Sequence, residues 1–88
     1  MNQAKSTQVV IYSTRTCPYC IRAKQLLESE GISFEEILVD ESPGLRQVME
    51  QKTGRRTVPQ IFIGEKHIGG FDELKALHEK GQLKAWLN

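Results

Sequence analysis

The 88-residue chain contains only two cysteines and no long apolar run. Small secreted domains usually carry several disulfides, so a scaffold built on cysteine pairs is not expected. No apolar run approaches the roughly 20 residues of a membrane-spanning helix, and the first ten residues lack the apolar core of a secretion signal. The charges nearly balance, with 12 Lys and Arg against 11 Asp and Glu, so no strong field recruits nucleic acid or a membrane. We therefore expect one cytoplasmic domain spanning residues 1–88.

The two cysteines lie three positions apart within the stretch TRTCPYCIRAKQLL, residues 14–27. A disulfide across so short a loop removes little entropy from the unfolded chain, which argues against a purely structural bridge. A zinc site needs four ligands, and the two histidines, 11 residues apart, lack the spacing of a ligand pair. A redox centre is the interpretation that explains both positions.

The residues after Cys17 predict an amphipathic helix from position 18 to about position 30, because apolar side chains recur at positions 20, 23 and 27. The first turn of a helix carries unpaired N–H groups and a partial positive charge, and both favour a thiolate. Pro18 suits the first helical position, where a missing N–H costs nothing. We assign Cys17, at the N-cap, as the nucleophile. Cys20, one turn in and on the buried face, is placed to attack a mixed disulfide on Cys17.

The rest of the chain alternates between strand and helix patterns. Strands are expected at residues 8–13 and 33–39, and a hairpin at 60–63 and 66–68 around a turn at Gly64. A second helix within residues 42–54 would bury one face, consisting of Leu45, Val48, Met49 and Lys52. Two more helical stretches are expected at 72–80 and 82–87. The order βαβαββα predicts an α/β fold in which helices flank a small four-stranded mixed sheet.

Three separated motifs resemble those of glutaredoxins, the glutathione-dependent members of the thioredoxin superfamily. They are CPYC at 17–20, TVPQIFI at 57–63 and IGGFDEL at 68–74, and the resemblance covers nearly the whole chain. CPYC is similar to the dithiol class, and the Trp-Cys-Gly-Pro-Cys stretch typical of thioredoxins is absent. The resemblance implies a thioredoxin-like fold. It also implies a glutathione-dependent thiol–disulfide oxidoreductase that reduces glutathione mixed disulfides and protein disulfides.

The resemblance further implies which residues bind glutathione. Val58, before a cis Pro59, would offer its backbone N–H and C=O to the cysteinyl part of glutathione, as an added strand does. Thr57 belongs to the same segment. Asp72 would bind the γ-glutamyl ammonium, or would be a plain helix cap. A close backbone approach at Gly70 would let the N–H groups of Phe71 and Asp72 bind the α-carboxylate.

Three further side chains are candidates for the same groove. The resemblance points to Arg46, 11 residues before Thr57, as the partner of the glycine carboxylate. Many glutaredoxins carry a Lys where this chain has Thr14, and the neighbouring Arg15 either reaches that carboxylate or is an ordinary solvated charge. Tyr19 either lines the groove or is an exposed aromatic side chain. Arg55 and Arg56, just before Thr57, lie near the groove, where they would either steer acidic partners or, as we prefer for Arg55, lie in a solvated turn. His67 and His78 are expected on the surface.

Two other classes of function stay open. One is a redoxin reduced by thioredoxin reductase, which Asp72 and Arg46 disfavour but which Phe71, where many glutaredoxins have Cys or Ser, leaves possible. The other is an iron–sulfur cluster carrier, a dimer joined through Cys17 and two glutathiones, which Pro18 disfavours. We expect a monomer with no bound metal and no permanent cofactor. Its partners would be glutathione, as co-substrate, and disulfide-containing or glutathionylated proteins, with no nucleic acid or membrane partner.

Overall fold

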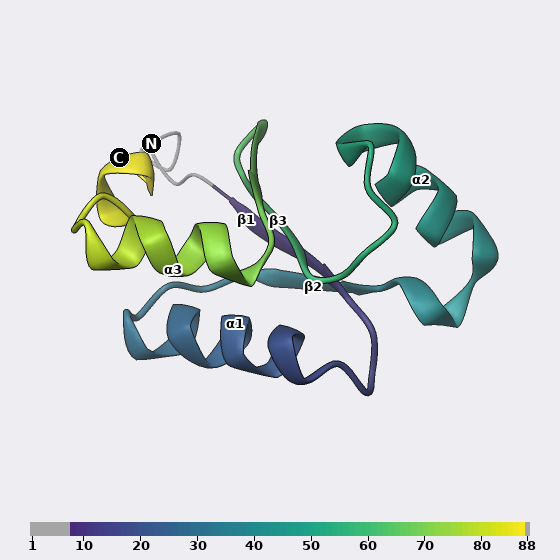
Figure 1. Cartoon of the computed structure of the whole chain (residues 1–88), viewed down its shortest axis with the longest axis horizontal. Coiled ribbons are helices and arrows are strands. Elements are labelled where there is room, and N and C mark those ends of the chain that lie inside the picture. Colours follow the sequence, from purple (N-terminus) through teal and green to yellow (C-terminus); the bar gives the residue numbers. More distant parts are fainter. Residues whose placement is uncertain (1–7, 88) are drawn as a thin grey trace, which may run out of the picture.

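The computed structural model describes residues 8–87, in which helices flank a four-stranded mixed sheet (Figure 1). The strands lie in the order β2-β1-β3-β4. Their bounds are β1 Val9–Ser13, β2 Glu35–Leu38, β3 Gln60–Ile63 and β4 Lys66–Gly69. β1 pairs in parallel with β2 and antiparallel with β3, and β3 and β4 form the predicted antiparallel hairpin. The α/β class and the predicted order of elements are confirmed.

Three α-helices and two short 3₁₀ turns connect the strands. Their bounds are α1 Pro18–Ser29, η2 Val39–Glu41, α2 Pro43–Thr53, α3 Phe71–Glu79 and η3 Lys84–Leu87. The sequence placed the start of α3 one residue too late and read the 3₁₀ turn η3 as a longer helix over 82–87. Within residues 8–87, none of the helices has the length and apolar character that a membrane crossing requires.

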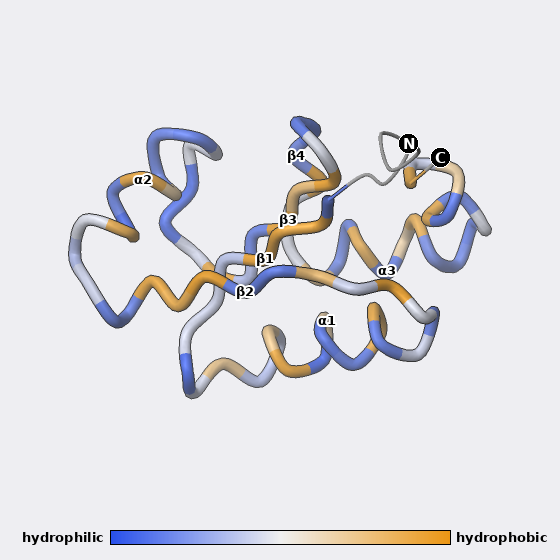
Figure 2. The backbone as a smooth tube through the Cα atoms, turned by 180° about the vertical axis from the view of Figure 1, so that it is seen from behind, coloured by the Kyte–Doolittle hydropathy of each residue, from blue (hydrophilic) through white to orange (hydrophobic). Residues whose placement is uncertain are grey.

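The two faces of the sheet are covered by different helices (Figures 1 and 2). Side chains alternate between the faces along a strand. Val9 and Ile11 of β1 therefore pack with α1 and α3, whereas Val10 and Tyr12 face α2. The face under α1 and α3 holds most of the buried core, which includes Ile61, Ile63, Ala23, Leu27 and Leu74. Each fully buried Ile or Leu side chain contributes about 1.5–3 kcal/mol. This packing fixes α1, and with it both cysteines, against the end of β1.

The second face is covered less completely, and here the prediction for α2 was partly wrong. Met49 is fully buried and Leu45, one turn earlier, is half-buried. Val48 is 41% exposed, because it lies about 100° around the helix from Met49. Lys52, in the last turn of α2, is also exposed. Gly54 closes the helix in the left-handed conformation, with φ 73°, as the sequence predicted.

Candidate active site

Cys17 is the N-cap of α1, as the sequence predicted. Its backbone is extended, with φ −109° and ψ 109°, and Pro18 occupies the first helical position. The Sγ atom accepts a hydrogen bond from the backbone N–H of Cys20 at 3.1 Å. Because a donor of the first turn points at this half-buried sulfur, the helix end stabilises negative charge on Cys17.

Cys20 is fully buried one turn further into α1. Burial raises the pKa of the Cys20 thiol to about 12, and its hydrogen bond with Cys17 adds to the effect. Both cysteines are free thiols. At neutral pH Cys20 therefore stays protonated, and Cys17 is the sulfur available for nucleophilic attack.

The segment Thr57–Pro59 lies against the nucleophile. The Val58–Pro59 peptide bond is cis, as the resemblance implied. The carbonyl oxygen of Val58 lies 3.8 Å from Cys17 Sγ, although the two residues are 41 positions apart. Next to it, Gly70 comes so close to the Pro59 carbonyl that an added Cβ would lie 3.3 Å from that oxygen. Gly70 therefore brings the start of α3 against the segment that borders Cys17.

A groove of about 260 Å³ runs between this segment and the start of α3. Its lining includes seven of the predicted site residues, which come from three separate elements: Tyr19, Thr57, Val58, Pro59, Gly70, Phe71 and Asp72. The ring of Tyr19 is 54% exposed, and its centroid lies 6.0 Å from that of Phe71. Cys17 lies beside the groove, because its Sγ contacts the carbonyl oxygen of Val58, which lines it. The structure therefore brings together most of the predicted site beside the reactive thiol.

Asp72 does not cap α3, so the alternative interpretation of this residue was wrong. The N-cap is Gly70, and its N–H donates to the Glu73 carboxylate at 2.7 Å. Asp72 is exposed in the first turn, and its carboxylate makes no hydrogen bond or ion pair with the residues at 8–87 that the structure describes. The carboxylate stands next to the free N–H groups of the helix end. One side of the groove therefore offers both an anion and anion-binding donors.

Three further residues line the groove, of which Gln60 and Glu73 were missed from the sequence. Arg55 was expected in a solvated turn, but it lines the groove and its guanidinium lies 3.9 Å from the Glu73 carboxylate. Gln60 is 1% exposed and donates to the backbone oxygen of Thr57 at 3.0 Å. Glu73 had a usable signal, since a carboxylate at the third helical position commonly caps a helix. For Arg55 and Gln60, the only signal in the sequence was that they lie close to Pro59.

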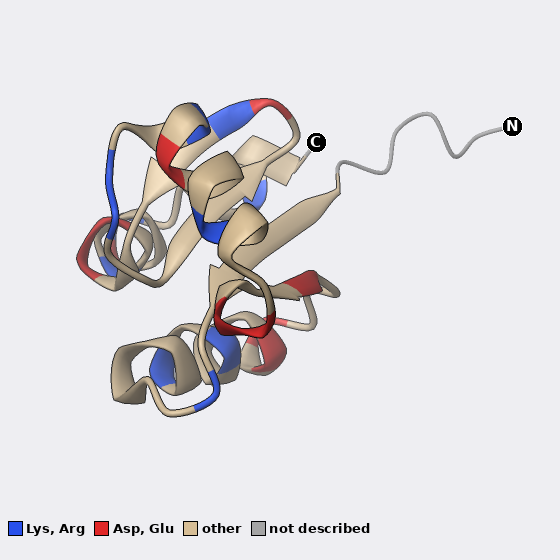
Figure 3. Cartoon of the chain, turned by 90° about the vertical axis from the view of Figure 1, so that its right-hand side faces the viewer, with Lys and Arg blue, Asp and Glu red and all other residues tan. Residues whose placement is uncertain are grey.

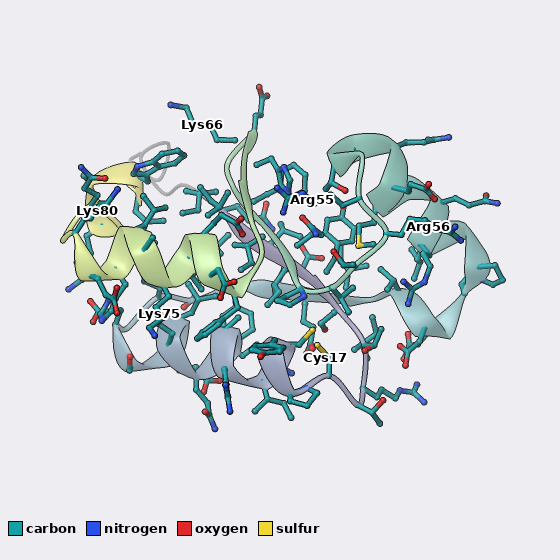
Figure 4. The ribbon with its side chains drawn as sticks, in the orientation of Figure 1. Cys17, Arg55, Arg56, Lys66, Lys75 and Lys80 are labelled. Carbon is teal, nitrogen blue, oxygen red and sulfur yellow. The ribbon has the colours of Figure 1, made fainter. Side chains whose placement is uncertain are left out.

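Arg46 and Arg15 lie outside this groove. Arg46 donates to the backbone oxygen of Arg56 at 2.8 Å and lines a second hollow, beside α2, together with Arg56. Arg15 forms an ion pair with Glu41 at 2.7 Å. In Figure 4, Arg55 lies on the side of the hairpin and Arg56 on the side of α2. The two hollows therefore meet at consecutive residues, because Arg55 and Thr57 line one and Arg56 lines the other.

Charges of both signs are interspersed around the site. Figure 3 shows basic and acidic residues on neighbouring stretches of the chain, with neither sign collected on one element. Over residues 8–87, no three His, Cys, Asp or Glu side chains gather closely enough to hold a metal ion.

The site is that of a thiol–disulfide oxidoreductase. A reactive thiol lies at a helix N-terminus, a protonated thiol lies one turn behind it, and a groove opens beside both. The first thiol can attack a disulfide, and the second can resolve the product.

Comparison with known proteins agrees with this chemistry. The family model of glutaredoxins matches residues 9–68. A glutaredoxin of Pseudomonas aeruginosa is 56% identical over 80 residues, which cover 91% of this chain and 95% of that protein. The solution structure of glutaredoxin from Brucella melitensis has a TM-score of 0.86 and 45% identity, and the match covers 98% of this chain and 94% of that one. The crystal structure of a buckwheat glutaredoxin–glutathione complex has a TM-score of 0.85 and 37% identity, covering 92% of this chain and 76% of that one.

The chain belongs to the glutaredoxin family, and its fold is thioredoxin-like. The resemblance drawn from the three sequence motifs is therefore confirmed.

Proposed function

We propose that the protein is a glutathione-dependent oxidoreductase that reduces glutathione mixed disulfides and protein disulfides. The observation that carries the proposal is the groove beside Cys17, whose polar groups match those of glutathione. The crystal structure of the similar buckwheat glutaredoxin is that of its complex with glutathione, and this supports glutathione as the ligand here.

Glutathione would lie extended across Val58. The N–H and C=O groups of Val58 would pair with its cysteinyl backbone, which places the glutathione sulfur near Cys17. The γ-glutamyl ammonium would meet the Asp72 carboxylate. The α-carboxylate would meet the N–H groups of Phe71 and Asp72 at the start of α3.

The glycine carboxylate would leave the groove toward the second hollow. Arg46 and Arg56 line that hollow, and Arg46 is fixed there by its hydrogen bond to the Arg56 carbonyl. A guanidinium suits a carboxylate because it can donate two parallel hydrogen bonds. Arg46 therefore stays our candidate for this end of the ligand, and Arg55 adds a cation where the two hollows meet.

In the monothiol route the Cys17 thiolate attacks the glutathione sulfur of a mixed disulfide. The substrate S–S bond breaks, the protein leaves as a thiolate that takes a proton, and Cys17 becomes glutathionylated. A second glutathione thiolate attacks this new disulfide, so glutathione disulfide leaves and the Cys17 thiolate returns. For a protein disulfide, Cys17 forms the mixed disulfide and Cys20 resolves it. Two glutathiones then reduce the resulting Cys17–Cys20 bond.

The test is turnover of a glutathione mixed disulfide in the presence of glutathione and glutathione reductase. The turnover rate is measured as the consumption of NADPH. We expect turnover that requires glutathione and that Cys17→Ser abolishes. Turnover that proceeds only with thioredoxin reductase would contradict the proposal and favour the rival redoxin. A coloured, cluster-containing dimer without exchange activity would favour the iron–sulfur carrier.

A further inference from the structure

A buried amide follows the loop that borders the nucleophile. Gln60 comes directly after Pro59, and its side chain is 1% exposed at the start of β3. Its Nε2 donates to the backbone oxygen of Thr57 at 3.0 Å and to Thr57 Oγ1 at 3.3 Å. Its Oε1 lies 2.7 Å from Nε2 of His67 on β4. The side chain thus joins the hairpin to the Thr57–Pro59 loop.

The donors and acceptors of the hydrogen bonds that link His67, Gln60 and Thr57 can be arranged in only one way. The Gln60 amide nitrogen is used as the donor toward both oxygens of Thr57. An amide oxygen can only accept, so Gln60 Oε1 requires a hydrogen on His67 Nε2. The direction is therefore His67 to Gln60 to Thr57. In the neutral ring the hydrogen must lie on Nε2.

His67 is held in place by its surroundings. It pairs with Phe62 across the hairpin, next to an irregularity in the register between Ile61 and Phe62. The His67 and Phe62 ring centroids are 5.1 Å apart. Burial lowers the pKa of His67, with Arg55 acting in the same direction and Glu73 against it. The ring is thus neutral at pH 7, and a neutral ring suffices as a donor.

This series of hydrogen bonds ends beside the active site, because Thr57 precedes Val58, whose carbonyl oxygen lies 3.8 Å from Cys17 Sγ. We propose that His67 is a positioning residue that acts through Gln60 to fix the Thr57–Val58 backbone at which the disulfide substrate binds. This inference rests on the proposed function, since it assigns substrate binding to that backbone. His67 itself touches neither sulfur.

The structure offers a conservative variant and a matched control. His67→Gln retains an N–H donor at the end of the side chain, whereas His67→Phe retains only the ring. His78 is also half-buried, but it lies on α3 near Glu30, with Nδ1 3.5 Å from that carboxylate, and has no bond to the loop. His78→Phe therefore removes a comparable ring without touching the chain of hydrogen bonds.

We would measure KM and kcat for a glutathione mixed disulfide in all three variants. His67→Phe should raise KM about fivefold and change kcat less than twofold, because the loop binds substrate but does not react. His67→Gln should restore KM to within about twofold of the parent protein, and His78→Phe should leave it unchanged. An unchanged KM in folded His67→Phe, or no rescue by His67→Gln, would overturn the proposal.

A measurement without substrate separates this inference from the proposed function. In the parent protein, nitrogen NMR of His67 above pH 7 should show the Nε2–H form. Hydrogen exchange at the Val58 amide should become faster in His67→Phe but not in His78→Phe. An Nδ1–H ring, or unchanged exchange at Val58, would overturn the positioning role even where glutathione turnover is normal. Absent turnover with these signals intact would instead overturn the proposed function alone.

Discussion

The backbone nitrogen of Cys20 donates to the Sγ of Cys17 at 3.1 Å, so the buried cysteine supports the reactive one through its main chain. The same turn of α1 buries the Cys20 side chain completely. The N-terminal turn of α1 therefore places two identical thiol groups in different environments. The outer sulfur accepts a hydrogen bond from the helix end, and the inner sulfur is held as a thiol by burial.

Replacing each sulfur in turn should separate the two routes. Cys17→Ser should abolish every exchange reaction. Cys20→Ser should keep most activity on glutathione mixed disulfides, because glutathione itself provides the second thiol. It should lose much of its activity on protein disulfides, and mass spectrometry should show Cys17 carrying one glutathione. Complete loss of the mixed-disulfide reaction in folded Cys20→Ser would rule out the monothiol route.

The high pKa of Cys20 should appear as slow alkylation. In Cys17→Ser only Cys20 can react, and burial, the larger cause of its high pKa, is unchanged. With a pKa of about 12 instead of the reference 9.0, about a thousandfold less thiolate is present at pH 8. Iodoacetamide labelling of the native variant should show no inflection below pH 10, while labelling in urea should be fast. An inflection near pH 9 in the native variant would show that Cys20 is not shielded.

Asp72 should act on ligand binding and not on folding. Asp72→Ala removes the proposed partner of the γ-glutamyl ammonium, and we expect KM for the glutathione mixed disulfide to rise about fivefold. The unfolding midpoint in urea should hardly change, because Gly70 and Glu73 cap the helix. Glu79→Ala, at the other end of α3, is the control and should leave KM unchanged. Equal KM values for Asp72→Ala and the parent protein would remove Asp72 from the site.

A half-buried ion pair should make stability depend on pH. Lys24 Nζ lies 2.8 Å from the Glu36 carboxylate, which also accepts from the Ser13 hydroxyl. Burial alone would raise the pKa of Glu36, but these two hydrogen bonds outweigh it and lower the pKa. Because the folded value lies below the unfolded one, the stabilisation is present above about pH 4.5 and is lost as the pH falls through the folded value.

Lys24→Gln should therefore cost about 1 kcal/mol of unfolding free energy at pH 7 in urea titrations, and the difference should narrow below pH 4.5. Lys75→Gln is the matched control. Its partner Glu79 is 3.9 Å away and both side chains are more than half exposed, so we expect almost no effect. A Lys24→Gln deficit that is the same at pH 7 and at pH 4 would mean that the pair is not its cause.

Gly69 should tolerate a methyl group less well than Gly31. Both have positive φ, 121° and 71°. A Cβ on Gly31 would meet nothing within 4 Å, whereas one on Gly69 would lie 2.8 Å from the Glu73 carboxylate that caps α3. We expect Gly31→Ala to cost about 1 kcal/mol and Gly69→Ala about 2–3 kcal/mol in urea unfolding. Equal costs would show that Glu73 moves aside freely.

The sequence alone determined the elements whose signals are local. The run of β-branched and aromatic residues from Val9 to Tyr12 indicates a buried strand, and Pro18 and Gly54 mark a helix start and a helix end. The different environments of Cys17 and Cys20 follow from their places in one helical turn. For the groove, the three motifs named seven residues that the structure brings together, because the resemblance supplied a fold in advance.

Only the tertiary structure decided how distant segments meet. The sequence places Arg55 near the groove, but that it lines the groove depends on Gly70 packing against the Pro59 carbonyl. The link from His67 through Gln60 to Thr57 exists because β3 and β4 pair with one particular register. Val48 is exposed because α2 turns only Met49 and Leu45 toward the sheet. Periodicity and capping act over a few residues, whereas these contacts depend on the relative placement of whole elements in the folded chain.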